Sequence, residues 1–296
     1  MKNNYQRTIF EALKWASSLL TEAGRDQNAS EILLMHILGL SRSELLARFH
    51  DPLPEEQDRL FSDFVKQHEL GVPVQHLIGF EYFYGRPFEV NKHVLIPRPE
   101  TEEVVLCALN MLNDVFPHDQ QLSVVDVGTG SGAIAITLAL ENKLLTVTAT
   151  DISLDALEVA KRNQQALGAD VHFLHGDLLE PVIAQGIKVD LFISNPPYIA
   201  VEEMGNLSDV VTKHEPENAL TDGRDGLWFY QRLTRDLHKV LNKQAVVVFE
   251  IGHTQAQDVQ ALLVQAFPSA DVSIVQDING KDRIVCAHIQ MESPAK

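Results

Sequence analysis

The spacing of apolar residues changes along the chain and divides it into regions. In the first quarter these residues recur at helical intervals, as in Ile9–Leu20 and Ile32–Leu40. Ser41 followed by Glu44 has the spacing of a capping box, which indicates the start of another helix. We therefore expect residues 1–75 to form a small helical bundle. Because this region holds no cluster of catalytic side chains, it is expected to present a docking surface.

In the next region the apolar residues recur at a shorter interval. Between Leu77 and Ile96, aromatic and β-branched residues alternate with other residues, and Gly85 lies where a turn is needed. This pattern predicts a β-hairpin linker over residues 76–98. The hairpin leads into the prolines of Pro97–Glu102, which stiffen the entry to a helix over about 100–112.

Strands and helices alternate in the remainder of the chain, residues 99–296. This order predicts an α/β domain with a mainly parallel sheet and helices on both faces. Ligands of such sheets bind beyond the carboxyl ends of the strands. The expected strands are Leu122–Val127, Leu145–Thr150, Val171–Leu174, Ile187–Ser194, Ala245–Glu250, 272–276 and 284–289, and the expected helices are 131–141, 153–167, 225–241 and 254–266.

A glycine-rich turn follows the first of these strands. Gly128, Gly130 and Gly132 allow the backbone to turn sharply and to approach a ligand closely, with a helix N-terminus behind it. The turn alone fits either S-adenosylmethionine or a nicotinamide dinucleotide, and also a purely structural role. Asp151, at the end of the next strand, is a suitable acceptor for ribose hydroxyls. It is also a candidate N-cap for the helix that begins at Ser153.

The motif Asn195-Pro196-Pro197-Tyr198 ends the strand Ile187–Ser194 and separates these alternatives. Two prolines remove backbone N–H groups, so the strand cannot continue its pairing. The Asn195 side-chain oxygen and the Pro196 carbonyl are two rigid acceptors that can bind both hydrogens of a planar NH₂ group, and Tyr198 can stack on that group. A nicotinamide enzyme needs a hydride acceptor and a proton donor instead, and the motif supplies neither. The remaining alternative is a plain proline-rich loop.

These motifs, in this order, resemble class I S-adenosylmethionine methyltransferases that act on planar amino groups. Further segments narrow the resemblance to the HemK/PrmC family, and it extends over nearly the whole chain. These segments are Pro73–Gly79, Phe83–Gly85, Leu95–Glu102, Glu215-Pro216 with Leu220, Asp225–Leu227 and Glu250–Gly252. The family methylates the side-chain amide of the glutamine in the Gly-Gly-Gln motif of bacterial peptide chain release factors, which aids translation termination.

The resemblance implies a Rossmann-like, seven-stranded mixed sheet over residues 99–296 and a role for individual residues. The implied cofactor contacts are Gly128, Thr129, Gly130, Ser131, Gly132, Asp151, Asp177, Leu178 and Asn195. The implied substrate contacts are Asn195, Pro196, Pro197, Tyr198, Arg98 and Glu100, of which Asn195, Pro196 and Tyr198 are the candidate catalytic residues. Leu178 departs from relatives that place an aromatic residue over the adenine.

Charge argues against a nucleic-acid substrate. The net charge is −17, and residues 101–296 carry 13 Lys and Arg against 27 Asp and Glu, a net of −14. Affinity for nucleic acid depends on basic residues that neutralise phosphates. The alternatives from other classes are a nucleic-acid amino-group methyltransferase that acts on adenine or guanine, and a non-catalytic S-adenosylmethionine-binding partner.

Composition also bears on compartment and metals. No run approaches the roughly 18 apolar residues of a membrane span, the N-terminal sequence lacks the apolar core of a signal peptide, and Cys107 and Cys286 are the only cysteines. A cytoplasmic protein with reduced thiols and no membrane association is expected. The histidines show no metal-ligand spacing, so no metal is expected.

Two segments near the expected site have open interpretations. Arg98 and Glu102 are spaced i, i+4 and could form a solvated ion pair; the resemblance makes the segment Pro97–Glu102 part of the active-site wall. The segment from Ile199 to Arg224 is long for a connector and follows the substrate motif directly. It is expected to act as a lid or a docking loop.

Overall fold

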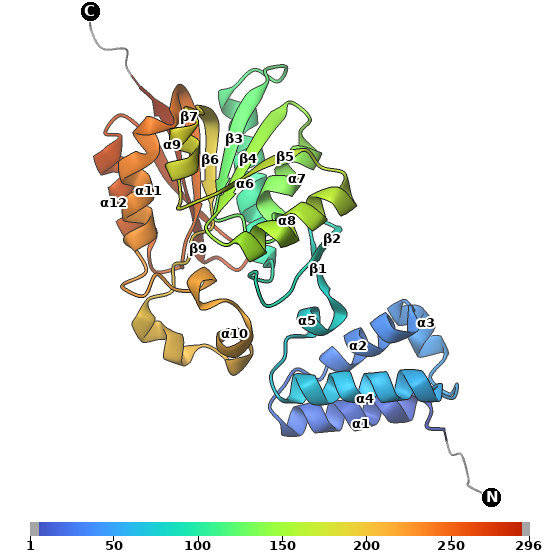
Figure 1. Ribbon diagram of the computed structural model, residues 1–296. Helices are drawn as coiled ribbons and strands as arrows, with labels where there is room; N and C mark the ends of the chain where they lie inside the picture. Colours follow the sequence, from blue (N-terminus) through green and yellow to red (C-terminus); the bar gives the residue numbers. More distant parts are fainter. Residues whose placement is uncertain (1–5, 292–296) are drawn as a thin grey trace, which may run out of the picture. The chain divides into compact units, whose positions relative to one another are not determined.

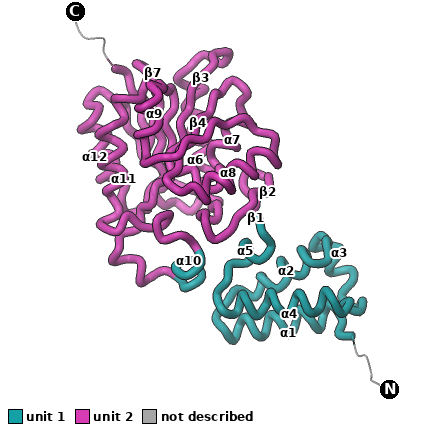
Figure 2. The backbone as a smooth tube through the Cα atoms, viewed as in Figure 1, with its two compact units in different colours: residues 1–80, 208–214 teal, residues 81–207, 215–296 magenta. Residues whose placement is uncertain are grey.

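The computed structural model describes residues 6–291, which form two compact units (Figure 2). The first unit extends to Phe80 and also includes Ser208–His214. The second comprises Glu81–Leu207 and the chain from Glu215 onward.

The first unit is the helical bundle expected from the sequence. Its core contains Leu20, Leu33, Phe61 and Val65, all fully buried. The predicted capping box is confirmed, because the Ser41 hydroxyl accepts from the N–H at N3 of its helix and the carboxylate at N3 accepts from Ser41 N–H. The helices are α1 (Ile9–Glu22), α2 (Ala29–Leu38), α3 (Arg42–Ala47), α4 (Glu55–Glu69), α5 (Val74–Ile78) and α10 (Asp209–His214).

Helix α10 comes from the long segment that follows the proline motif, yet it clusters with the helical unit. Arg25 donates two hydrogen bonds to the Asp209 carboxylate, at 2.5 and 2.9 Å. This two-pronged ion pair holds the pKa of the Asp209 carboxyl well below its usual range.

The linker contains less sheet than the alternation predicted. It forms strands β1 (Phe80–Phe83) and β2 (Arg86–Glu89), joined at Tyr84-Gly85, where φ is +52° and +74° as in the tight hairpin turn. The prediction of strand as far as Ile96 was wrong. The alternating residues Val90, Val94 and Ile96 are buried against helix α8 (Leu154–Leu167) of the second unit, so their pattern reflects packing of an extended segment without strand pairing.

The second unit contains the predicted mixed seven-stranded sheet (Figure 1). Its strand order is β5-β4-β3-β6-β7-β9-β8, with the first five parallel and the last two antiparallel to their neighbours. The strands are β3 (Leu122–Val127), β4 (Leu145–Asp151), β5 (Val171–His175), β6 (Val189–Ser194), β7 (Leu241–Glu250), β8 (Asp271–Gln276) and β9 (Asp282–Gln290).

Helices cover both faces of this sheet because successive strand side chains point to opposite sides. Val124 packs with helices α6 and α7, whereas its neighbour Val125 packs with α9, α11 and α12. Helix α8 lies beside α7. The helices are α6 (Pro99–Val115), α7 (Ala133–Glu141), α8 (Leu154–Leu167), α9 (Glu180–Ala184), α11 (Trp228–Asp236) and α12 (Ala256–Ala266).

The predicted helix over 225–241 was too long at both ends. The Asp222 carboxylate accepts from the N–H groups of Gly226 and Trp228, and α11 begins only at Trp228. After a 3₁₀ turn over Leu237–Lys239, strand β7 already begins at Leu241. The segment 199–224 also contains 3₁₀ turns at Val201–Asn206 and Glu217–Ala219.

Within residues 6–291, no helix combines the length and the apolar character needed to cross a membrane. The same residues contain no group of three or more His, Cys, Asp or Glu side chains arranged to hold a metal ion.

Candidate functional site

The candidate site lies where the strand order reverses in the second unit. The chain runs from β3 outward to β4 and β5, then returns to the other side of β3 as β6. Val127, the last residue of β3, is in register with Thr150 on β4 and with Ser194 on β6. The loops that follow these three residues therefore begin side by side, at the position where open α/β sheets bind ligands.

The three glycines of the first loop all have positive φ, between +56° and +82°, but they serve different purposes. A β-carbon at Gly128 or Gly130 would meet no atom within 4 Å, so these positions leave open space beside the backbone. A β-carbon at Gly132 would come within 2.8 Å of the Ile136 side chain, so this glycine allows the loop to pack on α7.

Asp151 connects the second loop to the first. One carboxylate oxygen accepts from Gly130 N–H at 2.8 Å and the other accepts from Ser153 N–H at 2.9 Å. Burial raises the pKa of Asp151, while these hydrogen bonds lower it. The helix N-cap is Ser153, whose hydroxyl accepts from Ala156 N–H, so the interpretation of Asp151 as the N-cap was wrong.

Asp126 supports the glycine loop from below and was missed in the sequence. Its carboxylate accepts from the Thr129 hydroxyl at 2.6 Å, while its second oxygen is buried with no partner among the described residues. Burial raises the pKa of Asp126 to about 7. The signal was present, because this aspartate precedes the first glycine by two residues.

The third loop positions Asn195 through groups from other elements. Asn195 Nδ2 donates to Thr101 Oγ1 at 3.3 Å, and Thr101 Oγ1 donates to Glu250 Oε2 at 2.7 Å. No described residue donates to Asn195 Oδ1 or to the Pro196 carbonyl. Both acceptors named in the sequence therefore have free lone pairs.

Tyr198 is anchored at its backbone and partly buried at its ring. Its carbonyl accepts from Gln255 Nε2 at 2.9 Å, and its ring packs against the core beneath α11 and α12. Burial raises the pKa of Tyr198 well above its ordinary value. The next residue, Ile199, donates its N–H to the Leu220 carbonyl. The end of the Asn195–Tyr198 motif is therefore also bound to the far end of the segment that follows it.

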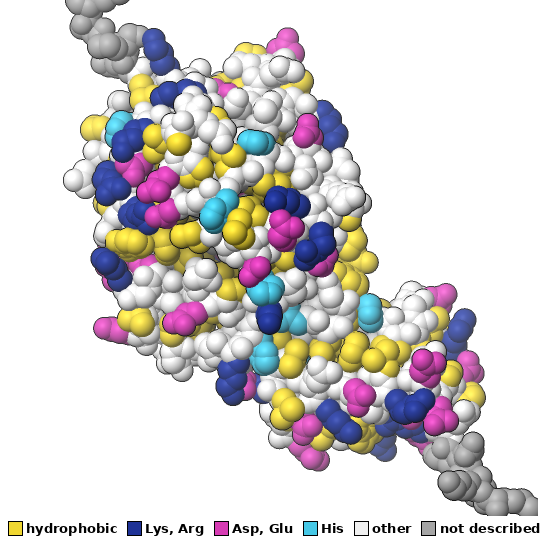
Figure 3. Space-filling model, viewed as in Figure 1, with side chains coloured by type: hydrophobic (Ala, Val, Ile, Leu, Met, Phe, Trp, Pro, Cys, Tyr) yellow, Lys and Arg dark blue, Asp and Glu magenta, His cyan; other side chains and the backbone are white. Residues whose placement is uncertain are grey.

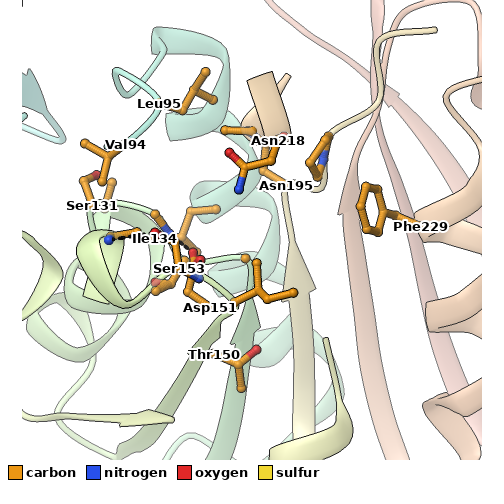
Figure 4. Close-up of a pocket in the computed structure, with 18 of the residues that line it drawn as sticks. Val94, Leu95, Ser131, Ile134, Thr150, Asp151, Ser153, Asn195, Asn218 and Phe229 are labelled. Carbon is orange, nitrogen blue, oxygen red and sulfur yellow. Dashed lines mark hydrogen bonds between the residues drawn. The ribbon is translucent and has the colours of Figure 1, made fainter. Parts of the chain in front are cut away.

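A cavity of about 400 Å³ opens over these loops (Figure 4). The predicted site residues that line it are Arg98, Gly128, Thr129, Gly130, Ser131, Asp151, Asp177, Leu178, Asn195 and Pro197. The predicted site residues that do not line it are Gly132, Glu100, Pro196 and Tyr198. Pro196 is buried, and the Tyr198 ring packs against the hydrophobic core that includes residues of α11 and α12.

Arg98 pairs with a carboxylate that lies far away in the sequence. Its guanidinium contacts Glu215 Oε1 at 2.5 Å, and the other oxygen of the buried Glu215 accepts from Ile96 N–H. Glu102 accepts from Tyr84 N–H instead. The suggested Arg98–Glu102 pair is therefore absent, and Arg98 lines the cavity while paired with Glu215.

Aromatic residues enter the cavity from a place that the sequence did not indicate. Leu178 lines the cavity with φ at +49°, and Trp228 and Phe229 line it from the start of α11. Arg232 donates to both oxygens of Asp177, at 3.1 and 2.6 Å, and lies over the Trp228 ring. These contacts join the loop after β5 to α11, so two aromatic residues line the same cavity as Leu178 although its own position carries none.

Comparisons with known proteins agree with this architecture. Residues 11–79 match the family model of the PrmC N-terminal domain, and residues 106–243 match that of the methyltransferase small domain. The chain is 56% identical to a release factor glutamine methyltransferase of Bacillus subtilis, over 96% of this chain and 98% of that protein. It is 54% identical to the protein of the same name from Bacillus cereus, over 95% and 99%. A solved human methyltransferase 10 domain containing protein shares the fold, with a TM-score of 0.50 and 16% identity over 79% of this chain and 98% of that one.

Proposed function

The chain belongs to the release factor glutamine methyltransferase family, and we propose that it methylates the side-chain amide nitrogen of the glutamine in the Gly-Gly-Gln motif of peptide chain release factors. The methyl donor is S-adenosylmethionine. The reaction takes place in the cytoplasm and aids translation termination.

The observation that carries this proposal is the pair of free acceptors beside the cofactor loops. Asn195 Oδ1 and the Pro196 carbonyl receive no hydrogen bond from the described residues, and Asn195 lines the same cavity as Gly128 and Asp151. Two acceptors can bind both hydrogens of a primary amide and direct its nitrogen. An amide nitrogen is a weak nucleophile because its lone pair is delocalised into the carbonyl, so orientation is what the site must provide.

The cavity fits S-adenosylmethionine in size and chemistry. Its volume of about 400 Å³ is in the range of small-molecule sites. The open sides of Gly128 and Gly130 allow close approach of the amino acid part, the Asp151 carboxylate can accept from ribose hydroxyls, and Leu178 with Phe229 offers apolar surface for adenine. When bound, the cofactor supplies an electrophilic methyl group.

The chain's own residues supply positioning and polar stabilisation. Asn195 and the Pro196 carbonyl accept from the two N–H groups of the amide and favour the pyramidal geometry that the nitrogen adopts as its new bond to carbon forms. After transfer, the N-methylated amide carries an extra proton and is acidic enough to lose it to water. No catalytic base is required.

The helical unit is proposed to dock the body of the release factor. Leu46 and Leu60 expose 47% and 44% of their surface on α3 and α4. Leu46→Asp and Leu60→Asp are expected to raise KM for the release factor and to leave S-adenosylmethionine affinity unchanged. Val264→Asp, at a residue of the second unit that is 45% exposed, is the matched control.

The distribution of charge supports a protein substrate. On the face of the second unit in Figure 3, basic and acidic side chains are interspersed and form no continuous basic patch. The net charge of −14 over residues 101–296 also opposes binding to phosphate backbones.

Transfer of labelled methyl groups tests the assignment. The full-length protein is incubated with methyl-labelled S-adenosylmethionine and, separately, with a release factor, DNA or RNA. Label is expected only in the release factor, and it should disappear when the motif glutamine is replaced. Label in nucleic acid, or label that survives the replacement, rejects the proposal.

A further inference from the structure

We propose that Thr101 and Glu250 are positioning residues that determine which end of the Asn195 amide faces the cavity. The inference deepens the proposed function and rests on it, because it concerns the same acceptor for the substrate amide. Neither residue is among the site residues that the sequence motifs identify.

The direction of the hydrogen bonds defines the orientation. An ionised carboxylate can only accept, so Thr101 must donate its single hydroxyl proton to Glu250 Oε2, at 2.7 Å. The Thr101 oxygen can then only accept, and it accepts from Asn195 Nδ2 at 3.3 Å. With its nitrogen committed to Thr101, Asn195 presents Oδ1 to the cavity, where an acceptor for the NH₂ group is required.

Two of the three residues lie in regular elements of the second unit, and Asn195 directly follows β6. Thr101 lies in the first turn of α6 and is 5% exposed, while Glu250 ends β7 and is 2% exposed. The Tyr230 hydroxyl donates to the Glu250 carbonyl at 2.7 Å and fixes the backbone there. Because Thr101 and Glu250 are both buried and hydrogen-bonded to each other, the direction of the bond between them is well defined.

Protonation of Glu250 would reverse the direction of the hydrogen bonds that run from Asn195 through Thr101 to Glu250. A neutral carboxyl can donate to Thr101, whose proton then points to Asn195 and favours the opposite amide orientation. That orientation presents an NH₂ group to the NH₂ group of the substrate. Burial raises the pKa of Glu250 to about 7, against the opposing influence of Thr101, Arg283 and the Asn195 amide.

Other ionisable groups also act on Glu250 and are part of the pH response. Glu100 on α6 raises the Glu250 pKa further, and Arg283 on β9 lowers it. Arg283 itself is paired with Asp277 in the turn before β9. The Tyr198 ring lies nearby with its pKa raised by burial, so it stays neutral over the range tested.

Substitutions at Thr101 distinguish the effect of its hydrogen bonds from the effect of its packing. Thr101→Val keeps the shape and removes the hydroxyl, whereas Thr101→Ser keeps the hydroxyl. Thr137→Val is the matched control, because Thr137 is fully buried on α7 and its hydroxyl has no partner among the described residues.

Thr101→Val is expected to lower turnover about tenfold, the effect of one net hydrogen bond, with KM and S-adenosylmethionine affinity within about twofold. Thr101→Ser and Thr137→Val should stay near the wild type. In the wild type, turnover should rise with pH through about 7 as Glu250 ionises, and in Glu250→Gln this step should be absent. Unchanged turnover in Thr101→Val, or an equal loss in Thr101→Ser, overturns the inference.

A second readout does not depend on any methyl acceptor. The side-chain amide signal of Asn195 in a nitrogen-15 spectrum, identified by its loss in Asn195→Ala, should shift with pH through about 7 in the wild type. It should not shift in Thr101→Val or Glu250→Gln. If the Asn195 signal does not shift with pH in the wild type, or shifts equally in Thr101→Val, the positioning role of Thr101 and Glu250 is refuted. Wild-type protein that shows this titration but does not methylate release factors refutes the proposed function alone.

Discussion

Gly226 lies so close to Tyr198 that a β-carbon at position 226 would be 2.3 Å from the Tyr198 carbonyl oxygen. Gly226 also has φ at +82°, and its carbonyl accepts from Gln255 Nε2, which donates to the Tyr198 carbonyl as well. The turn before α11 therefore fixes the position of the substrate motif.

Gly226→Ala is expected to displace the Asn195–Tyr198 loop and to lower turnover by about 10², because small misplacements of reacting groups cost this much. The control is Gly223→Ala, since Gly223 has a similar φ of +71° but open space around it. Turnover measured for both variants distinguishes the steric clash with the Tyr198 carbonyl, which only Gly226→Ala creates, from the backbone strain that both variants share. Equal losses in the two variants would show that contact with Tyr198 is unimportant.

Asp151→Ala is expected to weaken S-adenosylmethionine binding by about 1.5 to 3 kcal/mol, the range for hydrogen bonds to charged groups. Titration calorimetry measures the change. The control is Asp155→Ala, because Asp155 lies exposed in the first turn of α8, just after the loop that follows Asp151, and does not line the cavity. Unchanged affinity in folded Asp151→Ala would remove this carboxylate from the cofactor site.

Asn195→Ala removes one of the two proposed amide acceptors. Turnover should fall by about 10² to 10³, as for the loss of one transition-state hydrogen bond, while S-adenosylmethionine affinity changes much less. Asn218→Ala is the matched control, since Asn218 lines the same cavity without the contact to Thr101. Near-normal turnover in Asn195→Ala would contradict the mechanism.

Buried carboxyls predict how stability depends on pH. Burial raises the pKa of both Asp126 and Glu250 to about 7. Between about pH 4 and pH 7, the folded protein retains protons that the unfolded chain has lost, so the free energy of unfolding falls as pH rises and levels off above 7.

Asp126→Asn should flatten this dependence by roughly 2 to 4 kcal/mol in urea unfolding between pH 5 and pH 8. Substitution of the exposed Asp119 by Asn should leave the dependence unchanged. Glu250 leaves a smaller slope in Asp126→Asn, whereas a slope equal to that of the wild type would show that Asp126 is ionised throughout the range.

Local sequence patterns were sufficient to predict the strands and the loops at their ends. Because the strand ends at Val127 and Ser194 follow from apolar runs and their breakers, these patterns alone place the glycine loop and the Asn195–Tyr198 loop at one edge of the sheet. Arg98 shows the limit: local spacing suggested Glu102, but the partner is Glu215, which is brought close only by the fold. Thr101 and Glu250 lie in segments that carry the family resemblance, but neither has a local signal of the hydrogen bond between them.

Aromatic residues in the cavity illustrate a different limit. A residue over the adenine was sought at position 178, next to Asp177 in the chain. Trp228 and Phe229 approach instead from α11, which the Arg232–Asp177 ion pair holds against that loop. Tertiary contacts of this kind leave no repeating pattern in the sequence, so a single sequence does not reveal them.

The most direct test of the account is to locate the transferred methyl group. The full-length protein is incubated with S-adenosylmethionine and an unmethylated release factor, and the peptide that contains the Gly-Gly-Gln motif is fragmented in a mass spectrometer. The account predicts a mass increase of one methyl group, confined to the glutamine side-chain amide. A methyl group on any other residue, or an unmodified glutamine after incubation with active protein, would contradict it.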